Sequence, residues 1–346
     1  MGINKISKTV LLLMTTVLVM SLVYDLGKNP QQVLHALFPW LSVLLMVLIN
    51  IKLIRILGAI QTLSLPKIVM IALALVISAV MSGFTVSVAY VDAQLQSRTY
   101  PDVYKDCYKI WAARGLVLEG PDISHTGNQN SIESIGRAFA RGARGTEVDI
   151  HYDAEMGKFI VAHDKPYNLK NGALLTLESL FKATAGSSYY WLDFKKVRRL
   201  NDLELTQSVI ELERIAQLTN LKSKIYVEGE APFSLTAYRD AGFNTIFDTH
   251  PLPDSNPLTP PIINLYKLFY YFGDFTVMGM NYGAIDDPFY GPRTRQLLGD
   301  IPVFLYHVDD IPELLMMLSR LDTVRVILVL DHSRDRYSVS ACGIDK

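Results

Sequence analysis

Residues 145–152 read GTEVDIHY, a strand-like stretch that contains two acidic residues. Its Thr, Val, Ile and Tyr residues favour a β-strand. Side chains two positions apart lie on the same face of a strand, so Glu147 and Asp149 should lie side by side. Adjacent carboxylates repel unless a proton or a cation lies between them. The stretch therefore predicts a buried strand that contributes to a polar site.

Strand-like and helix-like segments alternate along the chain on both sides of this stretch. The other strand-like runs are KFIVAHD, YYWLDFK, SKIYVEGE, NTIFDTH, FTVMGMN, IPVFLYHV and VRVILVL. Between them lie helix-like segments such as SIESIGRAFARG, which ends at a glycine. Repeated units of this kind over about 250 residues predict a parallel α/β architecture. Because no Gly-rich dinucleotide fingerprint opens the first unit, a (β/α)8 TIM barrel is favoured over a doubly wound sheet.

The first 91 residues have the composition of a membrane anchor. The whole chain of 346 residues is 50% apolar and only 19% charged, with a mean hydropathy of +0.21. Soluble domains usually carry about 25% charged residues. We expect three transmembrane helices, over about 6–24, 33–51 and 68–91. The first run is interpreted as a retained helix rather than a signal peptide, because no small-x-small cleavage pattern follows it.

Basic residues indicate the orientation of this anchor. Lys5 and Lys8 precede the first run, the first connection DLGKNPQQ holds one Lys and one Asp, and the second connection is flanked by Lys52, Arg55 and Lys67. By the positive-inside rule, the N-terminus and the second connection should be cytoplasmic. With three spans, the rest of the chain then lies on the periplasmic or extracellular side of the cell inner (plasma) membrane if the host is bacterial. The runs hold almost no ionisable residue, so we expect an anchor rather than a transport pathway.

Beyond the anchor, residues 92–111 turn polar and are expected to form a juxtamembrane linker, with the barrel domain over 112–346. The chain carries 33 basic and 34 acidic residues, which argues against a nucleic-acid partner. Cys107 and Cys342 lack the spacing of a zinc module. A disulfide in an oxidising compartment and two free buried thiols both remain open. The sequence specifies no oligomeric state.

Polar residues also end other strand-like runs. His163 ends KFIVAHD, Asp193 and Lys195 lie two positions apart in YYWLDFK, and His125 is expected to end the first strand. The carboxyl ends of barrel strands form the active face, so these side chains should meet there. Each residue alone is typical of a solvated strand end or a surface ion pair, but together they favour a site. Three carboxylates without cysteine suit a hard cation such as Mg²⁺, Ca²⁺ or Mn²⁺.

The order of these motifs resembles the glycerophosphodiester phosphodiesterase family, within the PLC-like phosphodiesterase superfamily. The segments SHTG, NSIESIGRAFARGARGTEVDI, FIVAHD and WLDFK follow the family's His-Arg-Gly, Glu-Asn-Thr, Glu-Leu-Asp, His-Asp and acidic-x-Lys patterns. The resemblance covers residues 123–195 and is weak beyond them. SHTGNQNS and LDFK are also similar to the distant menorin branch of the superfamily. The resemblance implies a TIM barrel with a phosphodiester substrate.

Carried over by position, the family pattern makes Glu147, Asp149 and Asp193 the ligands of a divalent metal ion, Mg²⁺ or Ca²⁺. Asp193 is shorter than the Glu that is more common at its position. No further cofactor is implied.

The same resemblance implies that His125 and His163 form an acid/base pair and that Lys195 contacts the phosphate or the transition state. Thr126 then stands where the family has an Arg, and Gln129 replaces the Glu of Glu-Asn-Thr. Loss of an Arg removes a bidentate phosphate contact, so the substrate need not be an ordinary glycerophosphodiester.

The function implied is a membrane-anchored, metal-dependent phosphodiesterase that acts on glycerophosphodiester-like or phospholipid-derived substrates. One alternative is a phospholipase D-like lyase that forms a cyclic phosphate. Another is a degenerate, membrane-bound binding protein, favoured by the missing Arg. Four more polar residues are interpreted as strand ends and packing residues, with one of the two glutamates as an alternative pocket residue: Glu228, Glu230, His250 and His307.

Overall fold

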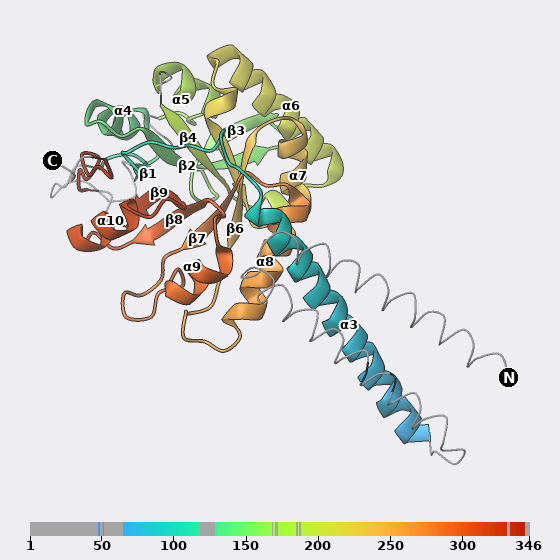
Figure 1. Cartoon of the computed structure of the whole chain (residues 1–346). Helices are drawn as coiled ribbons and strands as arrows, with labels where there is room; N and C mark the ends of the chain where they lie inside the picture. The colour runs from blue at the N-terminus through green and yellow to red at the C-terminus, as the bar shows by residue number, and fades with distance from the viewer. Residues whose placement is uncertain are drawn as a thin grey trace. The chain divides into compact units, whose positions relative to one another are not determined.

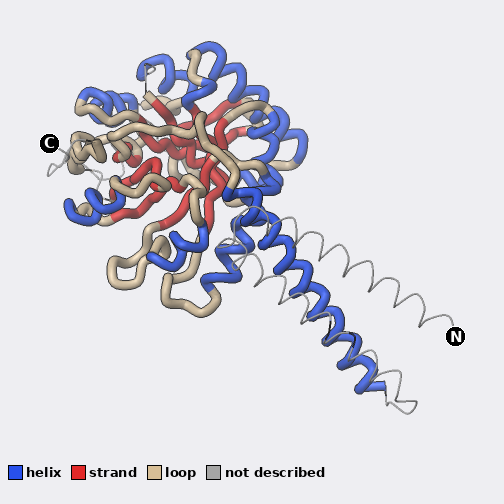
Figure 2. Tube along the Cα trace, viewed as in Figure 1, coloured by secondary structure: helices blue, strands red, loops and turns tan. Residues whose placement is uncertain are grey.

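The computed structural model describes one long helix and a barrel (Figures 1 and 2). The described residues are 48, 51, 65–117, 129–167, 169, 172–184, 186, 188–330 and 333–342. The chain forms two compact units, Met1–Gln94 and Leu95–Lys346.

The long helix, α3 (Leu65–Gln96), contains the third predicted membrane span, 68–91. Within the described residues, Val76–Gln96 is the helical stretch that is long and apolar enough to cross a membrane, judged by length and composition. The predicted spans over 6–24 and 33–51 lie almost entirely outside the described residues.

Eight parallel strands in the described part of the chain close into a barrel, which confirms the predicted TIM-barrel architecture. They are β1 (Ile110–Ala113), β2 (Gly145–Asp153), β4 (Tyr189–Phe194), β5 (Ile225–Gly229), β6 (Asn244–Thr249), β7 (Val277–Asn281), β8 (Val303–Val308) and β9 (Val324–Val329). β1 pairs with both β2 and β9, and this pairing closes the barrel. An additional strand, β3 (Lys158–Val161), pairs antiparallel with the end of β2.

Helices surround the strands, as Figure 2 shows. They are α4 (Ile132–Ala140), α5 (Leu177–Thr184), α6 (Asp202–Thr219), α7 (Pro232–Asp240), α8 (Thr259–Gly273), α9 (Pro292–Leu298) and α10 (Pro312–Ser319), with 3-10 turns at Val197–Arg199 and Lys222–Lys224. Local capping fixes where some of them begin. The Ser131 hydroxyl accepts from the Ser134 N–H at 3.0 Å, and the Asn201 side chain accepts from the Glu204 N–H at 3.0 Å.

The first barrel strand differs from the predicted one. The prediction that His125 ends it is wrong, because β1 is Ile110–Ala113 and already pairs on both sides. His125 lies outside the described residues, in the connection between β1 and α4. The segment expected as a linker, 92–111, also contributes to the barrel, since Tyr104 is buried in its core.

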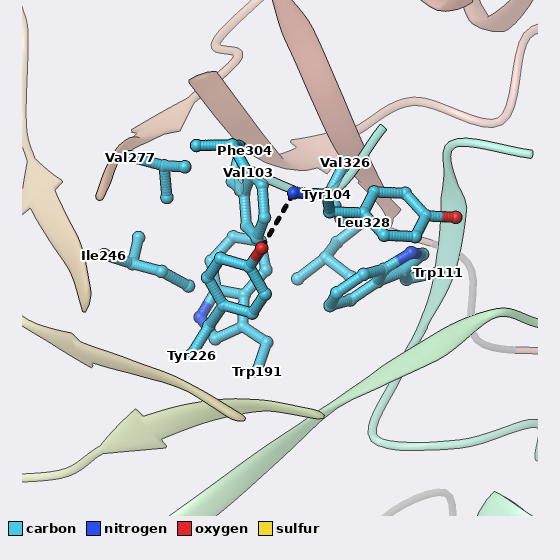
Figure 3. Packing of buried hydrophobic residues seen from close by; sticks show 10 residues of the cluster. All are labelled: Val103, Tyr104, Trp111, Trp191, Tyr226, Ile246, Val277, Phe304, Val326 and Leu328. Atoms are coloured by element: carbon cyan, nitrogen blue, oxygen red, sulfur yellow. Dashed lines mark hydrogen bonds between the residues drawn. The ribbon is translucent and has the colours of Figure 1, made fainter. Parts of the chain in front are cut away.

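Aromatic side chains fill one end of the barrel interior (Figure 3). Trp111 and Trp191 both contact Phe304, with ring centroids 5.6 and 5.4 Å apart. The Tyr226 hydroxyl accepts a hydrogen bond from the Tyr104 N–H at 2.8 Å, the dashed line in Figure 3. This packing fixes the segment before β1 to the barrel, and side chains fill that end of the barrel interior.

A disulfide joins Cys107 to Cys342, with Cα atoms 5.2 Å apart and a sequence separation of 235. The Ala341 N–H donates to the Cys107 carbonyl at 2.9 Å, so the two segments also pair through their backbones. Of the two alternatives that the sequence left open, the structure has the disulfide.

We expect the double variant Cys107→Ser/Cys342→Ser to lose about 2–5 kcal/mol of unfolding free energy, because the bridge restricts the unfolded chain. Urea titrations of the detergent-solubilised chain measure this difference. Reductant should lower the stability of the wild-type chain by a similar amount and leave the double variant unchanged. Two free thiols in unfolded, unreduced wild-type protein would contradict the bridge.

Candidate active site

The barrel interior changes from apolar to polar within two residues on several strands. Because side chains two positions apart share a face, an apolar residue is followed by a polar one nearer the carboxyl end of the strand. The pairs are Trp191 and Asp193 on β4, Tyr226 and Glu228 on β5, Ile246 and Asp248 on β6, and Phe304 and Tyr306 on β8. The apolar members form the cluster of Figure 3 and make the floor of the site.

A cavity of about 470 Å³ opens at this polar layer. Its polar lining residues are Arg114, Glu147, His163, Asp193, Lys195, Lys196, Glu228, Glu230, Asp248, His250, Tyr306 and His307. They come from strand ends far apart in the sequence, so closure of the barrel creates the site.

Three carboxylates meet at this face, as the sequence predicts. Glu147 and Asp149 come from β2, and Asp193 comes from β4. One oxygen from each lies within 4.8 Å of the others. Asp149 and Asp193 are also direct register partners on neighbouring strands. Parallel pairing therefore brings together acidic residues that are 44 positions apart in the numbering.

Two cations hold this carboxylate cluster together. The Lys195 Nζ atom lies 2.8 Å from Asp149 Oδ1 and also bonds Asp193. The Arg114 Nε atom lies 2.8 Å from Asp149 Oδ2 and 3.9 Å from Glu147 Oε2. Two cations thus face three acidic groups, so the cluster has one acidic group more than it has cations.

The electrostatics of the cluster fit a hard cation. Burial, and then the charge of Asp149, raise the pKa of Glu147 well above its usual range. Burial also acts to raise the pKa of Asp149, but the charges of Lys195 and Arg114 outweigh it and the pKa falls. Among the described residues, Glu147 Oε1 is buried without a hydrogen-bond partner. A carboxylate set with an unpartnered buried oxygen is a donor set for Mg²⁺ or Ca²⁺.

An asparagine fixes the most buried carboxylate. The Asn130 Nδ2 group donates to Asp149 Oδ2 at 2.7 Å, and the Asp149 N–H donates to Asn130 Oδ1 at 3.1 Å. The connection between β1 and α4 therefore returns to the cluster directly before α4 begins.

His163 lies in the cavity wall just after β3, about half exposed. Its Nδ1–H donates to Asp164 Oδ2 at 2.7 Å, because a carboxylate only accepts. The lone pair of the neutral ring is then on Nε2, where it can take a proton. The His151 Nε2–H donates to the His163 carbonyl at 3.1 Å and holds the backbone at this point.

Arg114 is a cavity residue that the sequence analysis missed. Ala113 ends β1, and Arg114 and Gly115 follow it directly. A Cβ atom on Gly115 would lie 2.5 to 2.7 Å from atoms of Ser134 and Ile135, so only glycine fits there. The expectation that the site lacks an arginine is wrong. Thr126, the supposed replacement, lies outside the described residues.

The wall beside the carboxylate cluster is acidic as well, since Glu228 on β5 is the register partner of Asp193 on β4. Glu228 is 7% exposed and accepts from Trp191 Nε1 at 2.7 Å, while Asp248 accepts from the Tyr306 hydroxyl at 3.0 Å. His250 Nε2 lies 3.4 Å from Asp248 Oδ2. Glu228, Glu230, His250 and His307 lie at or next to strand ends, as expected, but all four also line the cavity. The packing interpretation is therefore wrong, and the alternative of a glutamate in the pocket is confirmed. For Glu228, its position two residues after the buried Tyr226 was the available signal.

Neither a protein-family model nor a curated protein matches the chain. Solved structures similar to it include a putative glycerophosphodiester phosphodiesterase from Galdieria sulphuraria, with 14% identity, a TM-score of 0.47, and coverage of 65% of this chain and 94% of that one. A glycerophosphodiester phosphodiesterase from Parabacteroides distasonis has 19% identity, a TM-score of 0.46, and coverage of 65% and 93%. A putative glycerophosphoryl diester phosphodiesterase from Silicibacter pomeroyi has 14% identity, a TM-score of 0.48, and coverage of 68% and 93%.

The pKa of Asp248 predicts how stability depends on pH. Burial, and to a smaller extent the charges of Asp193 and Glu230, raise this pKa from 3.8 to about 6. Between these values the folded chain binds more protons than the unfolded chain, so this contribution to stability is present at low pH and is lost as pH rises through about 6. The difference in unfolding free energy between Asp248→Asn and wild type should therefore shift in favour of the variant by about 2–3 kcal/mol from pH 4 to pH 7.

Urea titrations in EDTA across this pH range measure the difference between the two chains. Glu155→Gln, at an exposed position on the turn between β2 and β3, is the matched control and should follow the wild-type profile. A constant difference between Asp248→Asn and wild type at every pH would contradict the expected titration.

Proposed function

We propose that the chain is a membrane-anchored, metal-dependent phosphodiesterase that acts on glycerophosphodiester-like or phospholipid-derived substrates. The observation that carries the proposal is the convergence of Glu147, Asp149 and Asp193 with Lys195 in one cavity at the carboxyl ends of barrel strands. Such a face is where barrel enzymes carry their chemistry. The sequence motifs and the arrangement of the site support the same reaction class.

In this proposal, the three carboxylates hold one divalent cation, Mg²⁺ or Ca²⁺. When bound, the ion supplies Lewis-acid polarisation of a phosphoryl oxygen. Lys195 and Arg114 keep Asp149 ionised and add positive charge where a phosphodiester binds. Because the acidic groups outnumber these two cations, a bound metal ion would supply the further positive charge that a phosphodiester anion needs.

Proton transfer is assigned to histidine. His163 Nε2 accepts a proton from the nucleophile, which is water or a neighbouring hydroxyl of the substrate, while Asp164 orients the ring. The leaving alkoxide needs a proton from a second group, and His125 is retained for this role. It belongs to the connection that starts at Arg114 and returns at Asn130, so both ends of its segment adjoin the carboxylate cluster.

One observation favours a second candidate function. Ala113 ends β1 where the resembling family has a His, so a member of the family's acid/base pair is missing from that strand. A binding protein that holds a phosphodiester without cleaving it would tolerate this loss. The metal ligands and Lys195 are still present, which favours the enzyme.

The test is a screen of the detergent-solubilised full chain against lipid and water-soluble phosphodiesters with Mg²⁺, Ca²⁺ or EDTA. We expect cleavage that EDTA abolishes. We expect a loss of about 10²–10⁴ in rate for His163→Ala with metal affinity nearly unchanged, because that residue only moves a proton. Asp149→Asn should lose both activity and metal affinity. Glu155→Gln, outside the cavity, should behave as wild type.

Product analysis by phosphorus NMR separates hydrolysis from the lyase reaction, which ends at a cyclic phosphate. Metal and phosphodiester binding without turnover would overturn the enzyme proposal in favour of the binding protein. Wild-type turnover by His163→Ala would overturn the acid/base assignment alone.

We also propose that residues 1–91 anchor the barrel domain on the periplasmic or extracellular face of the membrane. The apolar stretch Val76–Gln96 and the charge distribution around the predicted spans support this placement. The bridge between Cys107 and Cys342 supports it independently, because disulfides persist in oxidising compartments.

Reporter fusions after Lys346 test this topology in a bacterial host. Alkaline phosphatase at that position should be active, and a green fluorescent protein that folds only in the cytoplasm should be dark. The reverse pattern would show that the barrel domain is cytoplasmic.

A further inference from the structure

His307 occupies an irregular position at the carboxyl end of β8. The register between β8 and β9 shifts between Leu305 and Val308, and His307 has a φ of 53°. A non-glycine residue in this left-handed region costs about 1–2 kcal/mol. Bulges of this kind re-aim side chains near active sites. Here the re-aimed ring lines the cavity that also contains Arg114 and Lys195.

Asn281, at the end of β7, fixes the proton on this ring. Its Oδ1 atom accepts from the Gly283 N–H at 2.9 Å, so its Nδ2 group is the one that faces His307 Nδ1, at 3.2 Å. An amide nitrogen only donates, and the ring Nδ1 must therefore accept. The proton of the neutral imidazole is then on Nε2.

The surroundings also keep the ring neutral. Partial desolvation, and then the positive charges of Arg114 and Lys195, lower the pKa of His307. A second proton would have to go on Nδ1, where it would face the Asn281 amide donor. His307 is therefore held as a neutral ring with a single N–H to offer.

We propose that His307 is a catalytic hydrogen-bond donor whose Nε2–H binds a nonbridging oxygen of the phosphodiester. The inference rests on the proposed function and adds a residue to it. The bond from the nucleophile to phosphorus forms and the bond to the leaving oxygen breaks, while His307 keeps its proton throughout. A fixed donor placed where negative charge develops stabilises the transition state more than the ground state.

Substitutions of different length test the donor. His307→Gln, whose amide nitrogen reaches about as far as Nε2, should keep kcat within about tenfold of wild type. His307→Asn and His307→Ala should lose about 10²-fold, the usual effect of removing one such donor. His307→Asn is the matched control for Gln, because its amide reaches only the Nδ1 position. Equal activity in all three variants would overturn the proposal.

Asn281→Asp tests the tautomer. An aspartate accepts from Nδ1–H, which turns Nε2 into an acceptor, so kcat should fall about as far as in His307→Ala. Nitrogen NMR of the ¹⁵N-histidine-labelled full chain reads the tautomer directly. We expect an Nε2–H ring in wild type and an Nδ1–H ring in Asn281→Asp. An Nδ1–H ring in wild type would overturn the proposal whatever the kinetics show.

Inorganic phosphate separates this inference from the proposed function. Added to the labelled chain with Mg²⁺, it should shift the His307 Nε2–H signal. If the chain binds phosphate at His307 but cleaves no phosphodiester, the proposed function fails and the donor stands as a binding contact. If wild type is active while phosphate leaves the signal unmoved and His307→Ala keeps full activity, the donor fails and the proposed function stands.

Discussion

The mutual repulsion of three clustered carboxylates, two of them buried, is the constraint on which the site depends. Asp149 is fully buried, and Arg114, Lys195 and Asn130 all bond it. These partners come from the end of β1, the end of β4 and the residue before the α4 cap, so one carboxylate ties together three parts of the chain. Removing one partner of a buried charge pair typically lowers the free energy of unfolding by about 3–5 kcal/mol, because the other charge is left uncompensated. The bonds that hold Asp149 thus also hold the strand ends in register.

The alternation of side chains along each strand couples stability to function. On β4, Trp191 packs into the aromatic floor, and two residues later Asp193 joins the carboxylate cluster. On β8, Phe304 and Tyr306 have the same relation. The floor excludes water below the site, so the charges above it interact more strongly than they would in solvent. A shift of one residue in the register of such a strand would turn its floor and site side chains to the outer face of the barrel.

The sequence predicts what short-range periodicity determines. β2 and β4 are long and mix strand formers with charges, so Glu147, Asp149 and Asp193 could be identified and expected to meet. β1 has only four residues in a polar segment, and its pattern was too short to detect. Arg114 was missed for the same reason, since its role depends on where that strand ends.

Other parts of the site depend on contacts that no local pattern carries. The acidic wall forms because β5 and β6 pair beside β4. The orientation of His307 depends on a bulge and on Asn281 from another strand. The partner of Cys107 is 235 residues away, and two cysteines alone do not distinguish a bridge from two thiols.

The disulfide has a further consequence for the resistance of the domain to proteolysis. It links the segment that enters the barrel to the segment that leaves it, so residues 107–342 form a covalent ring. A protease that cuts one exposed loop within this ring opens the ring without dividing the molecule. Both pieces stay joined to each other and to the chain before residue 107. A nicked domain can therefore keep its strands assembled, and two cuts within the ring are needed to release a fragment.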